Sequence, residues 1–214
     1  MNSLNDRFFF FLKICRHESL LIEEIVSDIS NKLIGTSLSY AEGLVGMDSH
    51  TKAMDSLLCM GLDNARSVGI LGMGGIGKTT IARAIYEQIY TQFEGCYFLA
   101  NVREGSQKHG LDHLQVEPLS KTLKDGNPNV GISNTRINFI KDRLHSKKVL
   151  IVLDGVDNLE QMEYLAENHD WFGSGSRIIM TSREKHFLIT HGVSAIYEVR
   201  GLEDSEAFQL FICL

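Results

Sequence analysis

The sequence predicts an α/β domain in which a five-stranded parallel sheet is flanked by helices. Short apolar runs alternate along the chain with longer segments whose apolar residues recur three and four positions apart, as on one face of a helix. The run at residues 149–153 is apolar throughout, which favours a parallel strand covered on both faces. A glycine-rich stretch directly follows another short apolar run, as expected where a strand turns into a helix.

The elements follow from these patterns in chain order. Apolar residues at helical spacing predict a helix at residues 19–33, which Gly35 is well placed to end. The polar stretch at residues 36–43 is interpreted as a linker, and the polar segment 101–132 gives the weakest pattern, with one helix predicted at residues 114–123. Further helices are predicted at residues 49–60, 79–90, 137–144, 159–166 and 205–211, and strands at residues 68–71, 96–100, 149–153, 177–181 and 196–199.

These elements divide the chain into three parts. Residues 1–18 form an N-terminal segment without an assignment, and residues 19–43 form the helix and the linker. Residues 44–214 form the α/β domain itself.

Composition and charge narrow the classes of function. The chain has 214 residues, of which 43% are hydrophobic and 22% charged, as is ordinary for a globular protein. The net charge of -6 and the lack of clustered Lys and Arg argue against a nucleic-acid partner. The chain contains no run of about 20 apolar residues, so the sequence predicts no membrane span. The four cysteines are far apart and lack CxxC spacing, which favours a reducing cytoplasm over a disulfide framework.

A phosphate-loop pattern, G-x-x-x-x-G-K-[ST], lies directly after one predicted strand and before one predicted helix. Its glycines let the backbone curl so that successive N–H groups face phosphate oxygens, and the helix N-terminus adds a positive dipole end. Lys78 is expected to contact the β- and γ-phosphates, and Thr79 to offer its hydroxyl to Mg²⁺. The alternative is a glycine-rich turn with an exposed lysine. The predicted nucleotide-binding residues of the loop are Gly72, Gly74, Gly75, Ile76, Gly77, Lys78, Thr79 and Thr80.

Two more candidate residues follow the ends of predicted strands, where sheets of this type bind ligands. Asp154 ends the run at residues 149–153 and is expected to coordinate the metal together with Thr79; the alternative is a strand-end cap. Arg183 either reaches the terminal phosphate or forms a surface ion pair with an acid such as Glu184. For Arg103, a salt bridge with a nearby acid is a simpler expectation than an approach to the phosphates.

Together with their neighbours, these motifs resemble the nucleotide-binding domain of plant disease-resistance receptors, the NB-ARC class of P-loop NTPases. The resemblance begins near residue 20 and is carried by the loop at residues 72–80 and by four later segments. Asp157 stands where many members have tryptophan, which resembles the subclass with an N-terminal TIR domain. The four later segments are FLANVRE at 98–104, KKVLIVLDGVD at 147–157, GSGSRIIMTSR at 173–183 and YEVRGL at 197–202.

The resemblance implies ADP or ATP with Mg²⁺ as ligands, a role in defence signalling, and other immune-receptor chains as partners. It places the fourth strand between the first and the third, so that Arg183 faces the γ-phosphate. It also implies that the backbone at Val45 and Gly46 reads the adenine base.

Two departures limit these implications. The family usually has two acids after the third strand, whereas Gly155 follows Asp154 here. Loss of a general base costs about two to four decades in rate, so the chain is expected to be at most a weak ATPase. Residues 44–214 are expected to match the nucleotide-binding subdomain without the C-terminal helical subdomains. A receptor switch module, a free-standing weak ATPase and a non-functional fragment or decoy therefore remain open.

Overall fold

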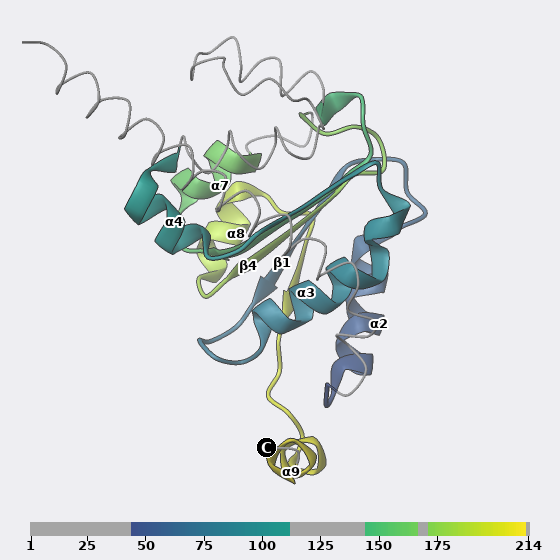
Figure 1. Cartoon of the computed structure of the whole chain (residues 1–214), viewed down its shortest axis with the longest axis vertical. Coiled ribbons are helices and arrows are strands. Elements are labelled where there is room, and N and C mark those ends of the chain that lie inside the picture. The colour runs from purple at the N-terminus through teal and green to yellow at the C-terminus, as the bar shows by residue number, and fades with distance from the viewer. Residues whose placement is uncertain (1–43, 112–143, 167–170, 213–214) are drawn as a thin grey trace, which may run out of the picture. The chain divides into compact units, whose positions relative to one another are not determined.

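Five parallel strands form the sheet, in the order β2-β3-β4-β1-β5 (Figure 1). The computed structural model describes residues 44–111, 144–166 and 171–212. The predicted helices at residues 19–33 and 114–123, the linker at 36–43 and nearly all of the helix at 137–144 lie outside the described residues. The strands are β1 (Arg66–Leu71), β2 (Gly95–Leu99), β3 (Val149–Val156), β4 (Arg177–Ser182) and β5 (Ala195–Glu198). The predicted α/β class with a five-stranded parallel sheet is confirmed.

Helices alternate with the strands along the chain. A 3-10 turn, η1 (Tyr90–Gln92), continues the helix after the phosphate loop. The helices of the described residues are α2 (Met47–Leu58), α3 (Lys78–Ile89), α4 (Val102–His109), α7 (Leu159–Ala166), α8 (Lys185–His191) and α9 (Asp204–Ile212). Each predicted strand in this region pairs in parallel, and β4 lies between β1 and β3, as the family resemblance implied.

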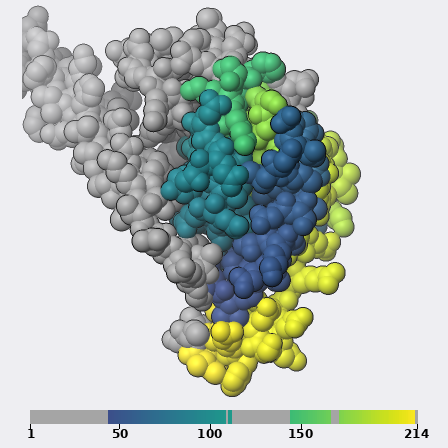
Figure 2. Space-filling view, turned by 90° about the vertical axis from the view of Figure 1, so that its right-hand side faces the viewer, coloured from purple at the N-terminus to yellow at the C-terminus, as the bar shows by residue number. Residues whose placement is uncertain are grey.

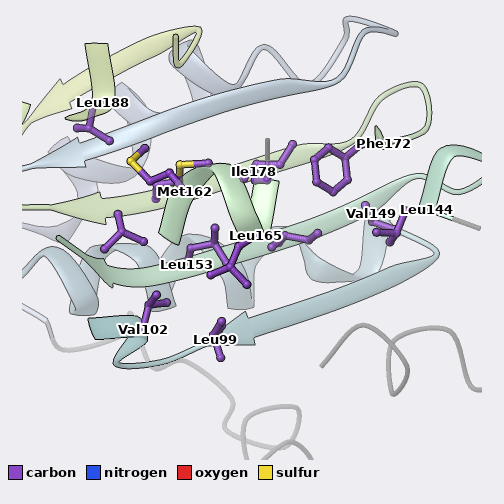
Figure 3. Packing of buried hydrophobic residues seen from close by; sticks show 14 of the residues in the cluster. Leu99, Val102, Leu144, Val149, Leu153, Met162, Leu165, Phe172, Ile178 and Leu188 are labelled. Carbon is purple, nitrogen blue, oxygen red and sulfur yellow. The ribbon is translucent and has the colours of Figure 1, made fainter. Parts of the chain in front are cut away.

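The sheet is buried on both faces, because its central strands direct apolar side chains into a cluster on each side. On one face, α2 and α3 pack against Val68, Ile70, Val152 and Ile179; Figure 2 looks toward these two helices. On the other face, α4, α7 and α8 cover a second cluster that is drawn in Figure 3. Two covered faces explain why the central strands lack the alternation of a half-exposed strand.

Strand β3 is longer than predicted. It runs on to Val156, where the sequence had indicated an end at Leu153. The pairing with β4 shifts between Leu153 and Val156, so that β3 contains a β-bulge at this point. Gly155 has a φ of 78°, which glycine adopts without strain, and this lets the strand continue past the irregularity.

Helices α4 and α8 were not predicted. Helix α4 is almost wholly polar, with Val102 as its main buried residue, so it lacks the apolar periodicity that marks a helix. Helix α8 has only seven residues and buries Leu188 alone. Helix α9 buries none of its residues, and Figure 1 shows it below the sheet near the C-terminus.

Among the described residues, no helix has the length and apolar character needed to cross a membrane.

Candidate functional site

The glycine-rich loop joins β1 to α3 at the carboxyl end of the sheet. Gly75 and Gly77 have φ values of 78° and 99°, a region of backbone conformation that favours glycine. A Cβ at Gly74 would lie 3.2 Å from Cζ of Arg183, so a larger residue there would require a small shift of this exposed side chain. Backbone conformation therefore explains the glycines at positions 75 and 77.

Lys78 is buried at the first turn of α3. Its Nζ donates hydrogen bonds to the carbonyl oxygens of Gly72 and Met73, both at 2.8 Å. Burial lowers the pKa of Lys78, the positive charge of Arg183 lowers it further, and Asp154 opposes the shift. An anion between Lys78 and Arg183 would relieve the repulsion between these two cations.

Arg183 lies beside the loop, directly after β4. Within the described residues its guanidinium has no hydrogen bond or ion pair, so the surface ion pair with Glu184 is not formed. This position follows from the strand order, because β4 is the immediate neighbour of β1. The guanidinium is thus available to an incoming anion.

Asp154 is the centre of a small hydroxyl network. Its Oδ1 accepts hydrogen bonds from Oγ1 of Thr79 at 2.8 Å and from Oγ1 of Thr181 at 2.7 Å. The Thr181 hydroxyl in turn accepts a bond from the N–H of Gly155 at 2.8 Å. The two threonine hydroxyls therefore hold the Asp154 carboxylate between the start of α3 and strand β4.

The oxygen atoms of Thr79 and Asp154 fit a magnesium ion. Mg²⁺ prefers hard oxygen ligands and binds through one or two protein groups, with phosphates and water completing its shell. No cluster of three or more His, Cys, Asp or Glu that could hold a metal occurs in the part of the chain that the structure describes. The donor set suits a metal shared with a phosphate ligand better than a metal held by protein alone.

A pocket of about 630 Å³ unites most of the predicted residues. Val45, Gly46, Gly72 and Ile76 are not part of its lining. Gly46 instead lies against Leu202 and Glu206, close to the start of α9. The predicted residues that line the pocket are Gly74, Gly75, Gly77, Lys78, Thr79, Thr80, Asp154 and Arg183.

The sequence reasoning missed the part of the pocket lining that comes from α4 and from the end of β3, together with the residues next to them. Asn101, Gln107 and Asp157 are among these residues. Thr181 also lines the pocket. It is a polar residue directly after three apolar residues near the end of β4, and this pattern could have marked it as a site residue. Arg103 forms the salt bridge expected of it, with Asp157 as the acid, at an Nε to Oδ2 distance of 3.0 Å.

Comparison with known proteins gives one family model and several resistance proteins that are similar to this chain. The family model described as "NB-ARC domain" matches residues 47–213. The disease resistance protein RPV1 of Vitis rotundifolia is 46% identical over 197 residues, covering 92% of this chain and 14% of that protein. The TMV resistance protein N of Nicotiana glutinosa is 45% identical, covering 89% of this chain and 17% of that protein. The chain thus spans about a sixth of the length of these relatives.

Among solved structures, Cdc6p from Pyrobaculum aerophilum has a similar fold. The TM-score is 0.61 at 16% sequence identity, covering 84% of this chain and 52% of that chain. At this identity the likeness concerns the fold alone.

Proposed function

This chain belongs to the NB-ARC family, and we propose that it binds ADP or ATP with Mg²⁺ as the nucleotide-binding module of a plant immune receptor-like protein. One observation carries the proposal. Lys78, Thr79, Asp154 and Arg183, which come from three separate segments, line one pocket at the carboxyl end of the sheet. This combination of two cations, a hydroxyl and a carboxylate matches the chemistry of a magnesium-bound phosphate chain.

Each residue has a distinct role in the proposal. Lys78 and the N–H groups of the loop hold the phosphates, and Arg183 contacts the terminal phosphoryl group. Thr79 and Asp154 hold Mg²⁺, which neutralises charge on the phosphates when it is bound. Val45 and Gly46 remain our candidates for contact with the base, in a region separate from the lining of the phosphate pocket.

The cellular setting is part of the proposal. Other immune-receptor chains are the proposed partners, because the relatives are named as resistance proteins. A cytoplasmic location agrees with the chemistry of the cysteines. Cys59 and Cys96, the two cysteines in the described residues, are free thiols, and burial raises the pKa of Cys96 to about 11. Unpaired thiols suit a reducing compartment.

The proposal is tested by titrating the purified chain with ADP, with and without Mg²⁺, for the wild type and Asp154→Asn. Asparagine can still accept the hydrogen bonds of Thr79 and Thr181, so the fold is expected to persist while the negative charge is lost. We expect Mg²⁺ to strengthen ADP binding to the wild type, and this gain to fall by about tenfold in the variant. Asp55→Asn, on the exposed face of α2, is the matched control. Equal gains in all three proteins would argue against a metal role for Asp154.

Gly155 offers a separate prediction about hydrolysis. A Cβ at this position would meet only Cα of Asn101, at 4.0 Å, so a side chain fits apart from the cost of the positive φ. Asp and Asn tolerate this backbone region better than other residues. We expect Gly155→Asp to hydrolyse ATP about 100-fold faster than the wild type, because it restores a proton acceptor beside the phosphates.

Gly155→Asn is the matched control for this experiment, since it makes the same demand on the backbone without a basic carboxylate. Single-turnover ATP hydrolysis measures both variants. Equal rates for Gly155→Asp and Gly155→Asn would show that the missing acid is not what limits turnover.

A further inference from the structure

Arg103, on α4, lines the same pocket as the glycine-rich loop. Its Nε contacts Oδ2 of Asp157 at 3.0 Å. Within the described part of the chain its terminal Nη groups have no bond of their own. The side chain is therefore anchored at its inner nitrogen while the outer edge of the guanidinium fork stays open.

The anchor is itself held in place by a buried framework. The N–H of Asp157 donates to Oε1 of Gln161 at 3.0 Å, and Nε2 of Gln161 donates to Oγ of Ser106 at 2.8 Å. Gln161 is 1% exposed, so this link between α4 and α7 is shielded from water. Because Ser106 and Arg103 are on the same helix, these hydrogen bonds fix the position of Arg103 relative to Asp157.

The ion pair alone does not account for this arrangement. The side chains of Arg103 and Asp157 are 52% and 33% exposed, and exposed pairs of this kind add about 0–1 kcal/mol to stability. A guanidinium edge with two N–H groups, in contrast, matches the geometry of a phosphoryl group and binds it through two bonds.

We propose that Arg103 is a further phosphoryl-binding residue, positioned by Asp157 in the pocket that Lys78 and Arg183 also line. This inference rests on the proposed nucleotide binding and extends it. The group bound is a phosphoryl oxyanion, either the terminal phosphate of a nucleoside triphosphate or a free phosphate beside a diphosphate. Arg103 then favours the triphosphate, or ADP with phosphate, over ADP alone.

The test measures dissociation constants of the full chain for ADP with Mg²⁺ and for a non-hydrolysable ATP analogue with Mg²⁺. We expect Arg103→Gln to weaken analogue binding about tenfold and to leave ADP binding within about twofold of the wild type. Lys108→Gln removes the same charge from an exposed position of α4 that does not line the pocket, and it should change neither constant.

A third arm separates the two sources of the phosphoryl group. Inorganic phosphate added with ADP should strengthen ADP binding to the wild type, but not to Arg103→Gln, if a free phosphate is bound. A tenfold effect on the analogue without this phosphate effect assigns the site to the terminal phosphate of the triphosphate.

The positioning role of Asp157 has its own readout. Asp157→Ala should weaken analogue binding in the wild-type background and have no further effect when Arg103 is already glutamine. Equal effects of Arg103→Gln on ADP and analogue, or no effect on either, overturn the inference while nucleotide binding by the wild type stands. A folded wild type that binds neither ligand overturns the proposed function instead.

Discussion

Replacing Arg177 with methionine is expected to lower the free energy of unfolding by about 3–5 kcal/mol. Arg177 is the first residue of β4 and is 0% exposed. Its guanidinium donates to five backbone carbonyl oxygens, and among the described residues no carboxylate pairs with it. The acceptors are the carbonyls of Leu58, Cys59, Leu62, Asn64 and Ser176, at 2.6 to 2.9 Å.

The size of the effect follows from the carbonyl oxygens that would lose their hydrogen-bond donors. Three of these carbonyls belong to the connection between α2 and β1, and a fourth belongs to Leu58, the last residue of α2, so Arg177 fixes this part of the chain to the sheet. Methionine fills a similar volume but satisfies none of them, and each buried acceptor that loses its partner costs about 1–3 kcal/mol. Since a typical domain has about 5–15 kcal/mol of stability in total, the loss is a large fraction of it.

Urea unfolding followed by circular dichroism measures this prediction. Arg200→Met makes the same chemical change at an exposed position and should stay within about 0.5 kcal/mol of the wild type. Arg177→Lys keeps the charge with fewer donors and should be intermediate, which preserves the test if Arg177→Met fails to fold. Equal stability of the Arg177→Met and Arg200→Met proteins would contradict the role assigned to the guanidinium.

Replacing Lys78 with methionine is expected to weaken ADP binding by at least about 100-fold. The ammonium group is placed at the loop by two carbonyl contacts, and methionine keeps the buried stem while removing the charge. The loop itself should persist, because its curvature depends on Gly75 and Gly77 rather than on the lysine.

Isothermal titration with ADP and Mg²⁺ measures the loss. Lys52→Met, on the exposed face of α2, serves as the control and should bind as the wild type does. A Lys78→Met protein that is folded and binds ADP within about threefold of the wild type would contradict the role of Lys78.

Much of the fold was predictable because its signals are local. The strand at residues 149–153 and the glycine-rich loop each carry a specific local pattern. The family resemblance added the position of the fourth strand between the first and the third. Asp154 and Arg183 could be placed near the loop because they follow the predicted strands; Arg183 does follow β4, whereas Asp154 lies within β3, which is longer than predicted.

The rest of the site could not be predicted because it depends on tertiary contacts. Helix α4 carries little apolar pattern, yet several of its residues line the pocket. The salt bridge between Arg103 and Asp157 joins segments that are far apart in the sequence. The bulge at Gly155 is defined by the pairing of β3 with β4, so the sequence of β3 alone does not predict it. Thr181 acquires its role only when β4 lies beside β3.

The most direct test of nucleotide binding is the identity and amount of nucleotide released when the purified chain is denatured. We expect ADP or ATP in a substantial fraction of wild-type molecules, and a loss of at least about tenfold in the Lys78→Met protein purified in the same way. A folded wild type that releases no nucleotide and does not bind ADP at about 1 mM would contradict the account, as would equal nucleotide content in the two proteins.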